Sequence, residues 1–411
     1  MRYLLSAAQV LTGPAGQRFD NGAVLVQGES IIAVGGHDDV RAAAGADVLE
    51  LTFPAATILP GLINAHVHLA FSAGPDRLEK LMAPADQARL ALAMAGRALD
   101  LLNCGVTTIR DLGDRDGLAV ALRESINTGD LIGPRILAAT APLTPPRGHC
   151  WFLGGEVAGP DQIRQQIERN AAAGADVIKV MASGGSMTPG GAQMWQPQFS
   201  TEELRTAVEE AHRLGLPVAA HAHGTSSIRA CADAGVDTIE HCTWLTGPGT
   251  VEPDEQTVAD IVAAGIAVCT ANCNDWRPLA RKYGAQRAQR IVGRVRWMAD
   301  RGVRLITGTD AGMEPFDNFP AALRGLEDWG FPRDQILEMA TVTTADAIGL
   351  ATTTGTLATG YSADLLVVDG DPLTDLTALQ HPTLVLARGR QHIPTVKPPP
   401  PLDGRSTTQQ S

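Results

Sequence analysis

The chain has 411 residues, of which 44% are hydrophobic and 19% are charged, and its formal net charge at pH 7 is −12. This composition predicts a large buried core and excludes a globally disordered chain. The negative charge argues against a nucleic-acid or anionic-membrane surface as a partner. The N-terminal apolar run is too short for a signal peptide, no run reaches transmembrane length, and the six cysteines contain no CxxC pair. We therefore expect a cytoplasmic protein with free thiols.

Both ends of the chain show the pattern of short antiparallel strands. Residues 1–57 alternate strand-like runs with Gly and Asn turns, as in AVLVQGESIIAVGG. Strand signals return in GTLATGYSADLLVVDGDPL and TLVLARGR, within residues 354–393. We expect these two segments to form one small composite β-sandwich domain. Residues 394–411 are rich in Pro, Ser, Thr and Gln and are expected to be a flexible tail.

Residues 58–353 alternate apolar strand-like runs with amphipathic helical segments. The strand-like runs are ILPGLINAHVHL, VTTIRDLG, RILAATAPL, DVIKVMASGG, PVAAHAHG, DTIEHC, AVCTANC and VRLITGTDAG. Clear helical patterns lie at 85–102, 200–214, 253–264 and 285–301, and the second opens with a capping box of Ser200 and Glu203. Eight strands that alternate with helices predict an α/β fold, a (β/α)8 TIM barrel.

Histidine, lysine and aspartate residues stand at the carboxyl ends of these predicted strands, where barrel enzymes place their active sites. They are His66, His68, Lys179, His221, His223, His241 and Asp310. His66 and His68 alternate along one strand, so both rings point to the same face. Taken singly, each of these residues has a simpler structural explanation, as a core histidine, a snorkelling lysine or a helix cap. Their convergence at one end of one barrel predicts a metal site.

The lysine needs its own explanation. Imidazole and carboxylate ligands suit zinc, and also manganese or iron. A charged Lys179 beside divalent ions would be disfavoured by desolvation and by like-charge repulsion. A neutral Lys179 can instead react with carbon dioxide to give a carbamate, whose two oxygens can bridge two ions.

The sequence thus suggests a binuclear centre in which a bridging hydroxide is the nucleophile. One ion is expected on His66, His68 and Asp310, the other on His221 and His241, with carboxylated Lys179 between them.

The motifs resemble those of the amidohydrolase superfamily, the metal-dependent hydrolases with a urease-like composite β-domain. The resemblance extends from Val24 to Arg390 and rests on LPGLINAHVHL, IKVMASGG, QFSTEELRTAVEEAHRLGLPVAAHAHG, IEHC, GTDAG and GYSADLLVVDGDPL. Lys179 in IKVMASGG, together with HAHG, is similar to the imidazolonepropionase-related branch, which contains Xaa-Pro and other Xaa-linked dipeptidases and ochratoxinase-like amidases. The resemblance implies zinc, the ligand set given above and a homo-oligomer.

The resemblance also implies substrate contacts. His223, the second histidine of HAHG, would contact the substrate. His149, in RGHCW, stands where this branch often has a histidine after two glycines, whereas Arg147 and Gly148 precede it here.

The combined prediction is a zinc-dependent amidohydrolase that cleaves the C–N bond of a dipeptide, an N-acyl amino acid or a related small amide. Asp310 and His223 are the predicted catalytic residues, and Asp310 carries the proton of the nucleophile to the leaving amine. We expect that amine to bear a carboxylate. The expected substrate contacts are His149, His223, Arg147, Trp151 and Met313.

Two alternatives stay open. The first is a mononuclear deaminase or a cyclic-amide hydrolase of the same superfamily. Such deaminases usually carry a glutamate three residues after the histidine of the fifth strand, where Gly224 stands here, and they would leave Lys179 without a role. The second alternative is a non-catalytic barrel that serves as a scaffold, against which the intact ligand set argues.

Overall fold

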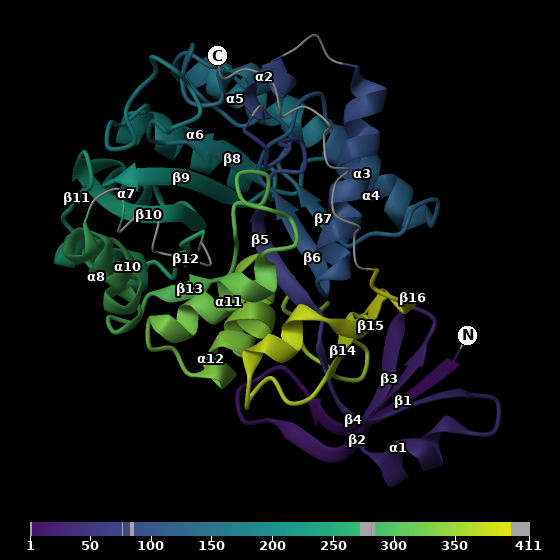
Figure 1. The fold of residues 1–411 in the computed structure, drawn as a ribbon. Coiled ribbons are helices and arrows are strands. Elements are labelled where there is room, and N and C mark those ends of the chain that lie inside the picture. Colours follow the sequence, from purple (N-terminus) through teal and green to yellow (C-terminus); the bar gives the residue numbers. More distant parts are fainter. Residues whose placement is uncertain (1, 76, 83–85, 272–280, 282–283, 396–411) are drawn as a thin grey trace, which may run out of the picture.

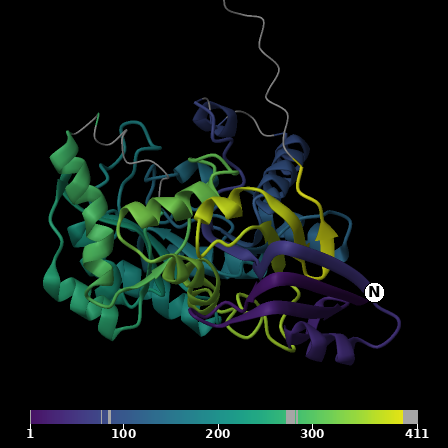
Figure 2. The same cartoon turned by 60° about the horizontal axis from the view of Figure 1, so that its bottom comes forward.

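The structure, a computed structural model, describes residues 2–75, 77–82, 86–271, 281 and 284–395. It has two parts, a barrel of strands surrounded by helices and a sheet that carries the N-terminus (Figure 1). In the turned view the N-terminal strands again lie to one side of the barrel, next to the C-terminal strands (Figure 2). No described helix combines the length and hydrophobicity that a membrane-spanning segment needs.

Strands from both ends of the chain form one seven-stranded sheet, in the order β16-β15-β14-β4-β1-β2-β3. Strand β14 runs antiparallel to β4, with Leu365 opposite Pro60. Helix α1 (His37–Ala44) packs Val40 against one face of the sheet. The strands are β1 (Arg2–Leu11), β2 (Arg18–Gln27), β3 (Ser30–Gly36), β4 (Leu49–Pro60), β14 (Leu365–Asp369), β15 (Pro382–Ala387) and β16 (Arg390–His392).

Because β4 continues almost directly into the first barrel strand, the sheet is attached to the barrel at Gly61. We propose that residues 1–57 with 354–393 are the small β-domain and that 58–353 are the barrel domain. The predicted flexible tail lies outside the described residues from 396 onward, and so does Cys273. The other five cysteines are free thiols.

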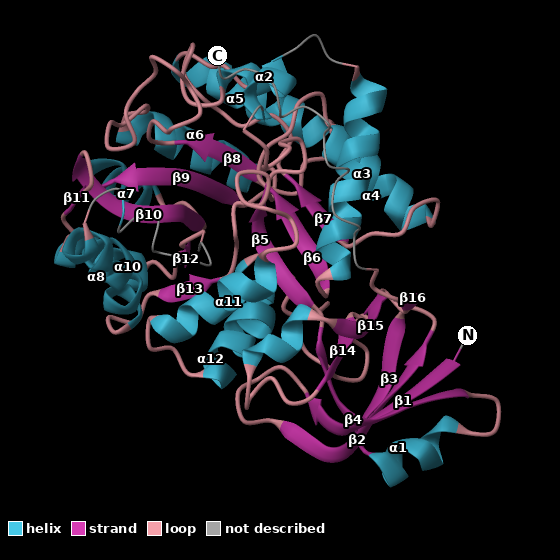
Figure 3. Ribbon diagram, in the orientation of Figure 1, coloured by secondary structure: helices cyan, strands magenta, loops and turns pink. Residues whose placement is uncertain are grey.

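Eight parallel strands form the barrel in the described part of the chain, as the sequence pattern predicts (Figure 3). Pairing is continuous from β5 to β7 and from β8 to β13, and single bridges from Leu143 to Val180 and from Val67 to Ala311 close the ring. The barrel strands are β5 (Leu62–Val67), β6 (Val106–Asp111), β7 (Arg135–Ala138), β8 (Ile178–Met181), β9 (Val218–Gly224), β10 (Thr238–Gly247), β12 (Ala267–Cys269) and β13 (Arg304–Ile306). A short strand, β11 (Thr250–Val251), pairs with the end of β10.

Helices follow the strands and cover the outside of the barrel. They are α2 (Arg77–Met82), α3 (Gln87–Asn103), α4 (Leu118–Thr128), α5 (Gly159–Ala172), α6 (Thr201–Arg213), α7 (Thr225–Ala234), α8 (Glu255–Ala263), α10 (Ala285–Ala299), α11 (Phe319–Asp328), α12 (Arg333–Glu338) and α13 (Thr344–Ala347). Shorter turns are η1 (Trp151–Leu153), the π-helical η2 (Met339–Thr343) and η3 (Leu376–Gln380).

The helices expected from periodicity are confirmed, the first of them from Gln87 onward, since residue 85 lies outside the described residues. The capping box of α6 is also confirmed. The backbone N–H of Glu203 donates to the Ser200 hydroxyl at 3.2 Å, and the Glu203 carboxylate accepts from the backbone N–H of Ser200 at 2.9 Å.

An apolar cluster joins three barrel strands to the helix α13. Ile63, Ala65, Ala267, Cys269 and Ile306, from β5, β12 and β13, cluster with Ala345 of α13 and with Ile348, which directly follows it.

Candidate metal centre

The residues predicted as metal ligands meet at the carboxyl end of the barrel. His66 and Lys179 lie within β5 and β8, and each is only 1% exposed. His241 lies in β10, and its ring centroid is 4.9 Å from that of His66 and 4.7 Å from that of His221 in β9. Asp310 follows β13. Its Oδ1 lies 3.5 Å from Nε2 of His66 and 3.4 Å from Nε2 of His68, which directly follows β5.

In the described part of the chain, three groups of three side chains each bring their ligand atoms within 4.8 Å of one another; two of them contain His241, and the third is His66, Glu240 and Cys269. Of the two groups with His241, the first is His66, His241 and Asp310, and the second is His221, His223 and His241. The second group contains His223, for which the sequence implies a substrate contact. The ring of His223 is stacked on that of His241, with centroids 4.5 Å apart.

The site contains buried polar atoms that need a partner. Nε2 of His66 and Nζ of Lys179 are buried and make no hydrogen bond within the described part of the chain. Burying such atoms unpaired is unfavourable. Burial lowers the pKa of Lys179, and this effect outweighs the negative charge of Glu240, which raises it. Burial also lowers the pKa of His221 and of His241 well below the ordinary value, which favours the neutral imidazole that can bind a metal ion. The donor set therefore fits a metal centre.

A buried carboxylate behind His66 is a part of the site that the sequence analysis misses. Glu240 in β10 is fully buried, and its Oε2 accepts a hydrogen bond from Nδ1 of His66 at 2.8 Å. Its Oε1 accepts from Nη2 of Arg110 at 2.8 Å and from the hydroxyl of Thr238 at 2.7 Å. Arg110, in β6, also donates from Nε to the backbone oxygen of Ala65 at 2.9 Å.

The charge state of this carboxylate follows from its partners. Burial alone would raise the pKa of Glu240, but the charge of Arg110 and the hydrogen bond from His66 hold it well below its ordinary value. The signal available in the sequence was a charged residue inside each of two apolar strand runs, DTIEHC and VTTIRDLG.

The predicted ligands His68, Lys179, His221, His241 and Asp310, but not His66, line a cavity of about 150 Å³, and so does His223. Other residues that line it are Phe71, His149, Cys150, Met181, Ser186, Met187, Met194 and Met313. The sequence analysis assigns no role to Phe71, Cys150 or Met181. Apart from the histidines, Lys179, Ser186 and Asp310, the walls are therefore apolar and rich in sulfur.

The structure separates the five predicted substrate contacts. His149 is buried, and its ring centroid lies 4.7 Å from that of His221. It packs directly on Gly185, where an added Cβ would lie 2.2 Å from the ring. His149, His223 and Met313 line the cavity, whereas Arg147 and Trp151 are not among the residues that line it. Arg147 is exposed, and its guanidinium carbon lies 5.9 Å from the centroid of the Trp151 ring.

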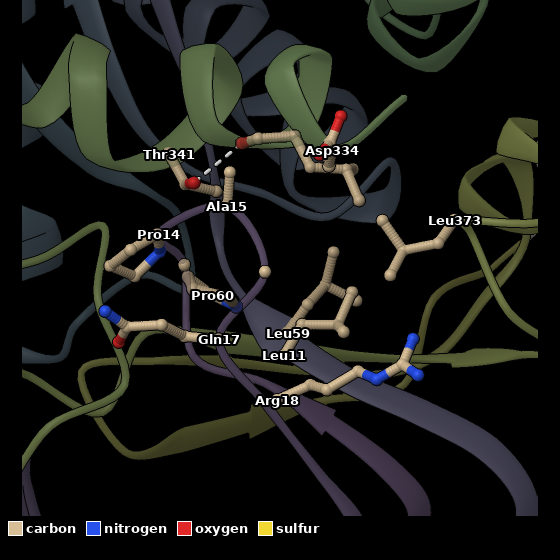
Figure 4. Close-up of a pocket in the computed structure, with 13 residues that line it drawn as sticks. Leu11, Pro14, Ala15, Gln17, Arg18, Leu59, Pro60, Asp334, Thr341 and Leu373 are labelled. Carbon is tan, nitrogen blue, oxygen red and sulfur yellow. Dashed lines mark hydrogen bonds between the residues drawn. The ribbon is translucent and has the colours of Figure 1, made fainter. Parts of the chain in front are cut away.

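A second hollow, of about 330 Å³, lies where the turn between β1 and β2 meets α12 and η2 (Figure 4). Its lining is largely apolar, with Leu11 and Leu59 on one side and Leu373 on another, and Arg18 and Asp334 are its charged residues. It contains no histidine or lysine, so we assign the chemistry to the smaller cavity at the end of the barrel strands.

Three known proteins are similar to this chain over most of its length. Ochratoxinase of Aspergillus niger is 26% identical over 416 residues, which cover 90% of this chain and 82% of that protein. Imidazolonepropionase of Chloroflexus aggregans is 26% identical over 423 residues, which cover 89% of this chain and 91% of that protein. The crystal structure of a Xaa-Pro dipeptidase with bound methionine in the active site has a TM-score of 0.82 and 25% identity, covering 96% of this chain and 100% of that one.

The profile of the Amidohydrolase family matches residues 57–391. This match and the similar proteins confirm the resemblance drawn from the sequence motifs, and they confirm a TIM barrel with an additional domain. The chain therefore belongs to the amidohydrolase family of hydrolases.

Proposed function

We propose that this protein is a zinc-dependent hydrolase with two divalent ions that cleaves the C–N bond of a small amide. The observation that carries the proposal is the meeting of five histidines, Lys179 and Asp310 in one cavity, where Nζ of the lysine is buried and has no hydrogen-bond partner among the described residues. Ions bound there would supply Lewis acidity toward the amide carbonyl and would lower the pKa of a water molecule.

We propose that Lys179 carries a carbamate. The neutral amine forms a bond from Nζ to the carbon of carbon dioxide and releases one proton, which leaves an anion with two oxygens. Support comes from the position of Lys179 in β8, where it is 1% exposed and lines the same cavity as His221 and His241. An anion at this position would balance the positive charge of two ions.

Asp310 is proposed as the proton carrier. Its side chain is 22% exposed, while the neighbouring side chain of His66 is 1% exposed. It therefore lies between the ligand cluster and the space that a substrate would fill. A carboxylate at this position can accept a proton from the nucleophile and deliver it to the leaving nitrogen.

Metal analysis of the purified protein separates this proposal from its rivals. We expect close to two zinc ions per chain. A single ion would favour a mononuclear deaminase, against which Gly224 and the buried Lys179 argue. No bound metal would favour a scaffold. The cytoplasmic location and the homo-oligomeric state remain predictions from the sequence.

We further propose that the leaving amine carries a carboxylate, as in a dipeptide or an N-acyl amino acid. One ring nitrogen of His149, Nδ1, is buried and receives no hydrogen bond from the part of the chain that the structure describes, and the residue lines the cavity. An imidazole N–H that donates to a carboxylate would hold the amide in place, while the methionine walls contact an apolar acyl part. The ochratoxinase and dipeptidase similarities agree with this class of substrate.

We predict that a dipeptide with a free C-terminal carboxylate is cleaved with a kcat/KM at least about tenfold higher than its C-terminal amide, because a charge-assisted hydrogen bond contributes roughly 1.5–3 kcal/mol. The ratio of kcat/KM for the acid and the amide is the measurement. His149→Ala should reduce this ratio, and Arg147→Ala, whose side chain lies outside the cavity, is the matched control. Equal kcat/KM values for acid and amide, or a preference for neutral anilides, would show that the substrate class is wrong.

A further inference from the structure

We propose that Glu240, held by Arg110, is a positioning residue that fixes the tautomer and the orientation of His66 and thereby sets the affinity of the metal centre. The inference rests on the proposed metal centre and goes beyond it, because Glu240 contacts none of the reacting atoms. It assigns a role to a buried carboxylate that is hydrogen-bonded to Nδ1 of the proposed ligand His66.

The hydrogen-bond geometry determines the tautomer of His66. The Glu240 carboxylate can only accept, and its second oxygen already receives hydrogen bonds from Arg110 and Thr238. Nδ1 of His66 must therefore carry the proton of the 2.8 Å hydrogen bond. In the neutral ring, Nε2 is then left with its lone pair.

The lone pair of His66 faces another acceptor. Nε2 of His66 and Oδ1 of Asp310 are 3.5 Å apart, and Nε2 makes no hydrogen bond within the described residues. Two acceptors that face each other are stable when a cation lies between them. Glu240 thus produces the arrangement in which His66 and Asp310 can bind one ion together.

The ion pair also fixes the backbone around the ligands. Arg110 donates to the backbone oxygen of Ala65, the residue before His66, and Glu240 is the residue before His241. One buried pair therefore connects β5, β6 and β10 directly behind two proposed ligands. A buried ion pair is in general a weak source of stability, because desolvation offsets the attraction. Orientation of the ligands is a better explanation for its presence here.

The experiment compares three variants with the wild type: Glu240→Gln, Arg110→Met and the double variant. Two quantities are measured, the zinc affinity of initially metal-free protein by competition with a chelator, and the thermal stability of the metal-free protein. We expect Glu240→Gln to weaken zinc binding by about 10- to 100-fold. Both single variants should also be destabilised, because each leaves a buried group without its partner.

The double variant separates positioning from simple structural support. It contains no unpaired buried charge, so its thermal stability should recover toward that of the wild type. Its zinc affinity should stay low, because His66 still lacks an anionic partner. Recovery of both quantities in the double variant would overturn the proposal, and so would an unchanged zinc affinity in Glu240→Gln.

Glu210→Gln is the matched control. Glu210 is a buried carboxylate on α6 that pairs with Arg213 on the outside of the barrel. This variant should keep the zinc affinity of the wild type. If the wild type itself binds no zinc tightly, the metal centre and this inference both fail. If the wild type and Glu240→Gln bind zinc equally, only the inference fails.

Discussion

Replacing Lys179 by alanine should remove most of the bound metal and reduce kcat by more than about 100-fold. Loss of a residue that only supports a metal ligand typically costs up to about 100-fold in activity, and loss of a ligand should cost more. Lys179 is the proposed bridge between two ions, and it lines the same cavity as the three proposed histidine ligands His68, His221 and His241. Without its carbamate the cavity would have to hold two divalent ions with Asp310 as its only described carboxylate. Metal content and kcat of the purified variant are the measurements.

Two additions make this experiment specific. Bicarbonate with a short-chain carboxylic acid should partly restore metal binding and activity, because a free carboxylate can occupy the space that the side chain leaves. Met181→Ala is the matched control, because Met181 lies two residues further along β8 and lines the same cavity. It should keep two metal ions. A Lys179→Ala variant with full activity and two tightly bound ions would disprove the bridging role.

Asp310→Asn should keep the fold and lower kcat by about 10²–10⁴, the usual contribution of a positioned acid–base group. The backbone of Asp310 is left-handed, with a φ of 58°, and asparagine tolerates this conformation well. The backbone N–H of Asp310 donates to the oxygen of His66 at 2.9 Å, and its own backbone oxygen accepts from Met313 at 2.9 Å. These bonds do not involve the carboxylate, so the loop should persist.

The metal content of Asp310→Asn must be measured beside its kcat, because Asp310 is also a proposed ligand. A low kcat with near-normal metal content supports the proton-carrier role. If added zinc restores a low kcat to the wild-type value, Asp310 acts in metal binding alone. An unchanged kcat with normal metal content would count against both roles.

The barrel and its histidines could be predicted from the sequence because the signals are local. His66 and His68 lie two residues apart in an apolar run, and four of the later strand runs carry a histidine, lysine or aspartate at or near their carboxyl ends. The pair of Glu240 and Arg110 could not be predicted in the same way. These two residues are 130 positions apart, and only the closed ring of strands brings them together.

The contacts around His149 show a second limit of sequence reasoning. Arg147, His149 and Trp151 lie within five residues, yet only His149 lines the cavity. The backbone is left-handed at Arg147 and at Cys150, with φ values of 58° and 57°. Left-handed residues other than glycine are uncommon and leave no mark in the sequence, so the path of this loop could not be predicted.

The composite sheet has a consequence for how the protein is made. Strand β4 needs β14 as a neighbour, and the side chain of Thr57 is hydrogen-bonded to Gly370, 313 residues later. At the usual rate of translation, β4 therefore waits roughly 15–60 s on the ribosome with one edge unpaired. Such an edge is a template for aggregation. Any truncation that removes β14 would make this exposure permanent, so the edge of β4 depends for its protection on a strand made about 300 residues later.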